Sequence, residues 1–323
     1  MIRRVYAGVV KTLGQSPVYE LIDVPSPSTN QIQIQVLAAG IHRIVRSIAS
    51  GQHYVKVNTL PLVPGIDGVG TLSNGKKVYF ITMKPPNGSF SQFVNVDPEM
   101  TISLPDSADP ILFAGIMNAG LASWTALTER ARIQSGESVL VLGVTGSAGE
   151  MAALSARLLG AKRVIGVGRN QSVLDQLVKD GKIDSSIPLV DDETQFQELI
   201  GKEGADVDIV MDFLWGKPTE LTMNGIQSAR KDSTQRLRWI QVGQMAGPTI
   251  QCSAGLLRSK NIEISGSGIG PISIKDMLKS LESMVPMVIE GKLTTSILSF
   301  PLKDIEKKWS ETANAKERVV VVM

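Results

Sequence analysis

The chain has 323 residues, of which 43% are hydrophobic and 20% are charged. This profile is typical of a globular protein, and the length allows two domains with sizeable cores. The 33 basic and 31 acidic side chains nearly cancel, so the charge gives no reason to expect a nucleic-acid partner. A single cysteine excludes an internal disulfide and a cysteine-cluster zinc site.

The sequence contains no obvious targeting or membrane segment. Residues 1–10 lack an apolar stretch of signal-peptide length, and no run approaches a membrane span. We therefore expect a cytoplasmic protein with no membrane partner.

Residues 1 to about 110 are predicted to be mostly β. Residues 31–36 alternate glutamine with Ile32, Ile34 and Val36, which indicates a strand with one face on a core. Glycine and proline separate further short strands near residues 69–72, 77–81 and 89–96. This pattern favours a small, bent, barrel-like domain.

The pattern becomes helical between Asp109 and Arg132, where apolar residues recur at three- and four-residue steps. The stretch from Gly115 to Gly120 interrupts this pattern, so we expect a pair of helices that cross from one domain to the next. Asn118 lies in this stretch. Its amide is a candidate to contact a cofactor, and capping a helix is the alternative role.

Residues 139–149 read Val-Leu-Val-Leu-Gly-Val-Thr-Gly-Ser-Ala-Gly, and a helix is predicted from Glu150 to Leu159. A buried strand, a tight turn and a helix in this order are typical of the phosphate-binding start of a dinucleotide fold. Val144, Gly146 and Gly149 take the three glycine positions of Gly-x-Gly-x-x-Gly, with valine in the first. An ordinary strand-to-helix turn is the alternative. The candidate cofactor-binding residues of this turn are Thr145, Gly146, Ser147, Ala148 and Gly149.

A second strand is predicted over residues 163–167 and ends at Gly168, Arg169 and Asn170. An NAD-binding site carries an acidic residue at this place, where it binds the ribose hydroxyls. The chain has an arginine instead, whose planar guanidinium can donate two charge-assisted hydrogen bonds to a phosphate. We therefore predict NADPH as the cofactor, and a solvated loop arginine is the alternative.

Strands and helices continue to alternate to about residue 265. The predicted helices are 172–180, 194–200 and 217–230, and the further strands are 187–190, 207–213, 238–242 and 262–265. Six strands with helical crossovers indicate one doubly wound parallel sheet, whose ligands bind past the carboxyl ends of the strands. The candidate cofactor-binding residues at the later strand ends are Leu214, Gly243, Gln244, Ser267 and Gly268.

The last part of the chain is expected to pack back against the first domain. We predict a helix over 277–290, with a kink or break at Pro286, a strand over 296–300, a helix over 303–313 and a strand over 318–322.

Five motifs in this order resemble one known family. They are residues 38–42 (Ala-Ala-Gly-Ile-His), 60–70, 120–127, the glycine turn at 143–149, and 207–212. The chain resembles the medium-chain dehydrogenase/reductase superfamily, in its zinc-independent, zeta-crystallin-like branch of quinone oxidoreductases. The resemblance implies an α/β fold with a GroES-like substrate domain (1–115), a Rossmann NADP-binding domain (116–275) and a C-terminal segment (276–323) that returns to the substrate domain. It also implies NADPH and a homodimer.

Departures from the family pattern bear on the chemistry. The zinc-dependent relatives have a cysteine where His42 stands and a histidine–glutamate pair where Ile66 and Asp67 stand, so we expect no metal. Quinone reductases similar to this chain often have an asparagine at the His42 position and a tyrosine at the Ser47 position, and both are missing here.

Hydride transfer to an enone or quinone leaves negative charge on the carbonyl oxygen, which calls for a hydrogen-bond donor. His42 and Tyr54 are the candidate catalytic residues. The alternatives are a histidine satisfied by a local carbonyl and a tyrosine exposed to solvent. We therefore predict an NADPH-dependent, metal-independent oxidoreductase for quinones or α,β-unsaturated carbonyls. A simple carbonyl/alcohol redox enzyme and an NADPH-binding sensor or structural protein with little turnover remain as alternatives.

Overall fold

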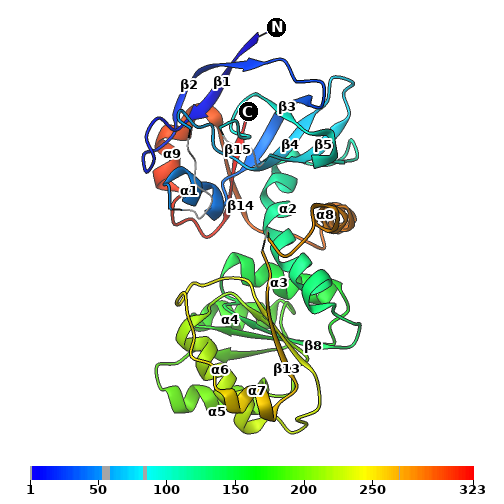
Figure 1. Cartoon of the computed structure of the whole chain (residues 1–323), viewed down its shortest axis with the longest axis vertical. Coiled ribbons are helices and arrows are strands. Elements are labelled where there is room, and N and C mark those ends of the chain that lie inside the picture. The colour runs from blue at the N-terminus through cyan, green and yellow to red at the C-terminus, as the bar shows by residue number, and fades with distance from the viewer. Residues whose placement is uncertain (1, 53–58, 83–85, 269) are drawn as a thin grey trace. The chain divides into compact units, whose positions relative to one another are not determined.

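The computed structural model describes residues 2–52, 59–82, 86–268 and 270–323. The chain forms two compact units, each with its own internal packing (Figure 1). Unit 1 comprises Met1–Ala119 and Leu281–Met323, and unit 2 comprises Gly120–Ser280.

Unit 1 is mostly antiparallel β-structure. Strands β1 (Ile2–Val9) and β2 (Val18–Pro25) form a hairpin that the sequence did not predict. A seven-stranded sheet has the order β14-β15-β3-β4-β5-β7, with β6 paired to β3. Its strands are β3 (Ile32–Gly40), β4 (Asp67–Thr71), β5 (Lys77–Ile81), β6 (Phe93–Val96), β7 (Thr101–Ser103), β14 (Ile297–Pro301) and β15 (Arg318–Val322).

The alternating stretch predicted in β3 packs as expected. Ile34 and Val36 are buried in a cluster with Val78, Phe80 and apolar residues of β6, whereas Ile32 is half-buried at its edge. Short helical segments complete this part of the unit: α1 (Arg43–Ala49) and η1 (Pro98–Met100).

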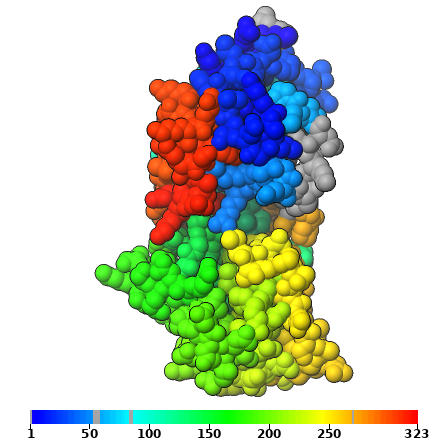
Figure 2. Space-filling view, turned by 90° about the vertical axis from the view of Figure 1, so that its left-hand side faces the viewer, coloured from blue at the N-terminus to red at the C-terminus, as the bar shows by residue number. Residues whose placement is uncertain are grey.

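The C-terminal residues of the chain complete the sheet of unit 1. Strand β15 pairs antiparallel with β3, and α9 (Ile305–Glu311), which follows η3 (Leu302–Asp304), packs against β2. Figure 2 shows the red C-terminal segment beside the blue N-terminal one. Helix α8 (Ile274–Ile289) includes Pro286 in its interior, so the break that we considered at this proline does not occur. Leu281, Met284 and Val288 are buried along one face of the helix, before and after the proline, and their burial stabilises the continuous helix.

The pair of helices predicted over residues 109–132 is wrong. Helix α2 (Pro110–Thr125) runs without interruption and continues as the π-helical segment η2 (Ala126–Ala131). Gly115 lies inside this continuous helix. A Cβ at this position would lie 2.7 Å from Cδ1 of Ile297, so the glycine allows β14 to pack closely against the helix. Asn118 lies inside α2, and its alternative role as a helix cap is therefore wrong as well.

Among the described residues, one helical stretch is long and apolar enough to cross a membrane by length and composition alone. It is Pro110–Ala131, and 67% of its most apolar window is buried inside the protein. The expectation that no run approaches a membrane span is thus wrong when it is judged by length and composition. Buried core helices of globular proteins also meet these two criteria.

Unit 2 is built on a six-stranded parallel sheet of order β10-β9-β8-β11-β12-β13. This is the order of a doubly wound dinucleotide-binding fold, with the change of direction between β8 and β11. The predicted α/β class is confirmed. The strands are β8 (Ser138–Leu142), β9 (Arg163–Gly168), β10 (Ser185–Pro188), β11 (Ile209–Asp212), β12 (Leu237–Gln241) and β13 (Ile262–Gly266).

Helices cover both faces of this sheet (Figure 1). On one face, apolar residues of η2, α3 and α4 pack with β8, β9 and β11. On the other face, residues of α5, α6 and α7 pack with the same strands and β12. The helices are α3 (Ser147–Leu158), α4 (Gln171–Lys179), α5 (Glu193–Glu203), α6 (Gly216–Ala229) and α7 (Ala254–Ser259), of which α7 was not predicted.

Candidate cofactor site and buried histidine

The glycine turn joins β8 to α3. Gly143 has a φ of 90°, a left-handed conformation that favours glycine, and it therefore makes the sharp turn after the strand. The sequence register had placed Val144 in the first glycine position. Val144 is instead fully buried in the core, and the role of the first glycine falls one residue earlier.

The start of α3 lies very close to this turn. A Cβ on Gly149 would overlap the carbonyl oxygen of Gly143 and would lie 2.7 Å from Cα of Val144. Gly146 is the N-cap residue of α3 and caps the helix with no side chain. On its open side, a Cβ would meet only the oxygen of Gly143, at 3.6 Å.

These features fit a bound pyrophosphate. Helix α3 begins at Ser147, so its first amides are those of Ser147, Ala148 and Gly149. They lie at the positive end of the helix dipole, where an anion is stabilised. Because no side chain covers Gly146, a phosphate group could approach these amides closely. Thr145 packs its methyl group against Gly168 at the end of the next strand.

At the end of β9, Arg169 and Asn170 are both exposed. Asn170 is already engaged as the N-cap of α4, since its Oδ1 accepts from the Val173 amide at 3.2 Å and from the Ser172 hydroxyl at 2.8 Å. Within the described part of the chain, the guanidinium of Arg169 forms no hydrogen bond or ion pair. It is the basic group at this strand end that is free to bind a phosphate.

Asp212 organises the loop that follows β11. Its buried carboxylate accepts hydrogen bonds of 2.6–3.0 Å from the amides of Leu214 and Trp215, the hydroxyl of Thr219 and the indole of Trp239. Burial raises the pKa of Asp212, and these donors only partly offset that effect. The loop brings Leu214 beside Gly143, where its Cδ2 would lie 3.0 Å from a Cβ.

The remaining candidates follow β12 and β13. The amide of Gly243 donates to the carbonyl of Asp212 at 3.0 Å, and that of Ser267 donates to Gln241 at 2.8 Å. Gln244 and Gly268 are exposed. Because the strands are parallel, all these segments lie at the same edge of the sheet as the glycine turn. Asn118 is the one candidate cofactor residue in unit 1.

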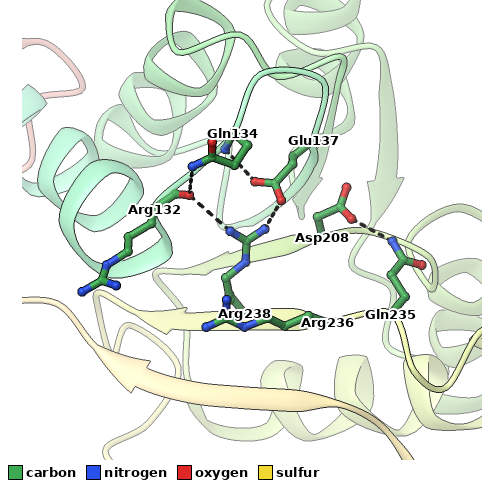
Figure 3. Close-up of a pocket in the computed structure, with 7 residues that line it drawn as sticks. All are labelled: Arg132, Gln134, Glu137, Asp208, Gln235, Arg236 and Arg238. Atoms are coloured by element: carbon green, nitrogen blue, oxygen red, sulfur yellow. Dashed lines mark hydrogen bonds and ion pairs between the residues drawn. The ribbon is translucent and has the colours of Figure 1, made fainter.

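A cavity of about 480 Å³ lies at the opposite edge of this sheet, where β8, β11 and β12 begin (Figure 3). Its charged groups other than the Arg132 guanidinium are engaged within the protein. The guanidinium of Arg238 points to Glu137 and to backbone carbonyls of η2 and its C-cap, Arg236 pairs with Glu263, and Asp208 accepts from Gln235. This cavity is therefore distinct from the edge to which the glycine turn points.

In unit 1, His42 lies directly after β3 at the N-cap of α1. It is only 4% exposed, and its Nε2 lies 3.0 and 3.1 Å from the two carboxylate oxygens of Asp67. The hydroxyl of Tyr79 donates to Oδ2 of Asp67 at 2.6 Å. Burial, followed by the charge and hydrogen bond of Asp67, raises the pKa of Tyr79 well above its usual value. The partner of His42 is thus a carboxylate from another strand and not a local carbonyl.

Sequence analysis missed Asp67 and Tyr79 as partners of His42. The available signal was an acidic residue at the start of a strand that otherwise consists of glycine, valine and threonine. Tyr54, the other candidate catalytic residue, lies outside the described residues. In the part of the chain that the structure describes, no three His, Cys, Asp or Glu side chains gather as a metal site would require.

A doubly wound sheet with an open glycine turn after its first strand gives unit 2 the architecture of a dinucleotide-binding domain. No protein-family model matches the chain. It is 32% identical to the probable NADPH-dependent quinone reductase tdiC of Emericella nidulans, over 95% of this chain and 96% of that protein. The chain belongs to the quinone oxidoreductase family of the medium-chain dehydrogenase/reductase superfamily.

Solved structures agree on the fold. A mycobacterial quinone oxidoreductase superposes with a TM-score of 0.83 at 20% identity, over 99% of this chain and all of that one. The quinone oxidoreductase of Thermus thermophilus, whose complex with NADPH has been solved, superposes with a TM-score of 0.76 at 22% identity, over 98% of this chain and 100% of that one.

Proposed function

We propose that this protein is an NADPH-dependent oxidoreductase that reduces a quinone or an α,β-unsaturated carbonyl by hydride transfer, without a bound metal. The observation that carries the proposal is the open glycine turn with Arg169, and no carboxylate, at the end of the neighbouring strand. The similarity to a probable NADPH-dependent quinone reductase along nearly the whole chain supports it.

Each candidate residue then has a binding role. The amides of Ser147, Ala148 and Gly149 bind the pyrophosphate, and Gly146 leaves them accessible. Arg169 binds the 2′-phosphate that distinguishes NADPH from NADH. The other cofactor contacts are assigned to Asn118, Thr145, Gly168, Asn170, Leu214, Gly243, Gln244, Ser267 and Gly268, with Asn170 contributing through its backbone because its side-chain oxygen caps α4.

Bound NADPH supplies a hydride from its nicotinamide ring. The protein must orient the acceptor and stabilise the negative charge that develops on its carbonyl oxygen. A single well-placed donor lowers such a barrier by about 3–4 kcal/mol. His42 is the donor that we assign to this role, and Tyr54 is a second candidate from the sequence.

Three further properties belong to the proposal. Metal independence is supported by the amino-acid composition, with one cysteine and two histidines, and by the engagement of Nε2 of His42 with Asp67. A homodimer is proposed from the family resemblance, and the cytoplasmic location expected from the sequence is carried forward as a proposal. Sedimentation of the purified protein tests the first of these two, and fractionation of cells tests the second.

The activity is tested by NADPH oxidation with a panel of quinones, enones and simple aldehydes and ketones. Turnover of quinones or enones supports the proposal. Turnover of simple carbonyls alone would indicate a carbonyl/alcohol redox enzyme. Tight NADPH binding with no turnover on any acceptor would indicate a sensor or structural protein.

Cofactor preference is tested separately with Arg169→Ala. Loss of charge-assisted hydrogen bonds worth about 1.5–3 kcal/mol should weaken NADPH binding about 10- to 100-fold and leave NADH binding unchanged. The matched control is Arg258→Ala, which removes an exposed arginine of α7 near the opposite edge of the sheet. An unchanged NADPH preference in Arg169→Ala would remove the 2′-phosphate assignment.

A further inference from the structure

The buried chain of side chains from Tyr79 through Asp67 to His42 determines which nitrogen of the histidine can act. We infer that Asp67 and Tyr79 are positioning residues that fix a proton on Nε2 of His42, so that His42 meets its ligand through Nδ1. The inference rests on the proposed function for its catalytic consequence, but the position of the proton can be observed without turnover.

The direction of each hydrogen bond follows from the groups involved. Tyr79 stays protonated because its pKa is raised well above the usual value, so its hydroxyl donates to Asp67. An ionised carboxylate only accepts hydrogen bonds, and both oxygens of Asp67 lie within 3.1 Å of Nε2. Nε2 must therefore carry the hydrogen.

Other charged groups lie near Asp67. Arg318, on β15, interacts electrostatically with Asp67, and Arg43, at the start of α1, lies close enough to interact with Arg318. Asp67 is fully buried and has His42 and Tyr79 as hydrogen-bond partners, so the network is shielded from water.

The ring of His42 is held on one side. A Cβ on Gly40 would overlap both Nε2 and Cε1 of the ring, so the glycine leaves just enough space for this orientation. Nδ1 forms no hydrogen bond to a described residue. Because Nε2 is engaged by Asp67, Nδ1 is the ring nitrogen left to meet a ligand.

This arrangement separates two chemical roles of His42. In the neutral ring, Nδ1 has a lone pair and can only accept a hydrogen bond, for example from a hydroxyl group. In the imidazolium form, Nδ1–H donates to the substrate oxygen. As negative charge develops on the substrate oxygen, the Nδ1–H bond breaks, an O–H bond forms, and the neutral ring keeps its proton on Nε2. A proton taken up from solvent then restores Nδ1–H, so each turnover consumes one solvent proton at this ring.

The test is a nitrogen-15 spectrum of histidine-labelled protein. The chain has two histidines, His42 and His53, and a His53→Gln variant assigns the two rings. For neutral His42 we expect Nε2 to show the chemical shift of a protonated nitrogen and Nδ1 that of an unprotonated one. A proton on Nδ1, or a mixture of both forms, would overturn the inference.

Variants supply a second, kinetic measurement. Asp67→Asn can donate as well as accept, so it should give a mixed ring signal and lower kcat about 100-fold, within the range for general acid catalysis, with KM for NADPH unchanged. Tyr79→Phe keeps the Nε2 signal and should lower kcat about fivefold. An unchanged kcat in Asp67→Asn would refute the positioning role. If the wild-type protein shows the expected ring signal but reduces no acceptor, the proposed function fails and the proton assignment stands.

Discussion

Gly149→Ala tests whether the close approach of α3 to the glycine turn is needed for folding. The added methyl group would overlap the carbonyl oxygen of Gly143 and would lie 2.7 Å from Cα of Val144. Both are backbone atoms, so no side-chain rotation can relieve the overlap, and α3 must move away from β8. Overpacking of this kind costs about 1–3 kcal/mol, and we expect the upper end of the range because only backbone can give way.

The measurement is thermal or urea-induced unfolding of the full chain. A loss of about 3 kcal/mol corresponds to a decrease in Tm of about 6–12 °C for a domain of this size. The matched control is Gly146→Ala in the same turn, where φ is −91° and the new methyl group would lie 3.6 Å from the nearest atom. Its stability should change by less than about 1 kcal/mol, since glycine is only modestly better than alanine as a helix cap.

The two variants should rank in the opposite order in their effects on cofactor binding, where Gly146→Ala should be the harmful one. Gly146→Ala places a methyl group on the open side of the turn and should weaken NADPH binding while the fold stays intact. If Gly149→Ala unfolds like the wild-type protein, or if Gly146→Ala binds NADPH normally, the reasoning about this turn is wrong.

Three further outcomes are expected. Gly40→Ala should lower the free energy of unfolding by about 1–3 kcal/mol and abolish the Nε2 signal of His42, because its methyl group takes the space of the ring; an unchanged spectrum would contradict this. Asp212→Ala leaves four donors without their acceptor and should lower the unfolding free energy by at least about 3 kcal/mol, and a near-neutral result in urea unfolding would count against its role in the loop. Burial raises the pKa of Asp208, but hydrogen bonds from Ser138 and Gln235 outweigh this effect and hold the pKa below its usual value. The stability that Asp208 contributes is therefore fully present above about pH 4. It is lost as the pH falls through the lowered pKa of the folded protein. Unfolding of Asp208→Asn and wild type should therefore differ at neutral pH and converge in acid, and a constant difference would contradict the assignment.

The sequence alone determined the architecture of unit 2, and it predicts the edge of the sheet at which a cofactor would bind. Short runs of apolar residues specify the strands locally, and the segments of helical periodicity between them specify the helices. Glycines mark the strand ends. The strand boundaries at Lys77–Ile81 and Arg318–Val322 were correct for the same reason, since alternation and flanking turn residues lie within a few positions of each other. The predicted turn at residues 143–149 is correct, but the motif register assigned the first glycine position to Val144, whereas Gly143 is the residue with a positive φ.

The network around His42 was decided only by tertiary structure. Asp67 lies 25 residues and Tyr79 a further 12 residues along the chain. The antiparallel register pairs Val69 with Tyr79 and Asp67 with Ile81, which places Tyr79 and Asp67 on the same face of the sheet. The role of Gly115 in α2 was also decided by tertiary structure. Its lack of a side chain makes room for Ile297, which lies far away in sequence. Local patterns specify elements, whereas the partners of a buried charge and the need for a small residue depend on which strands the fold brings together.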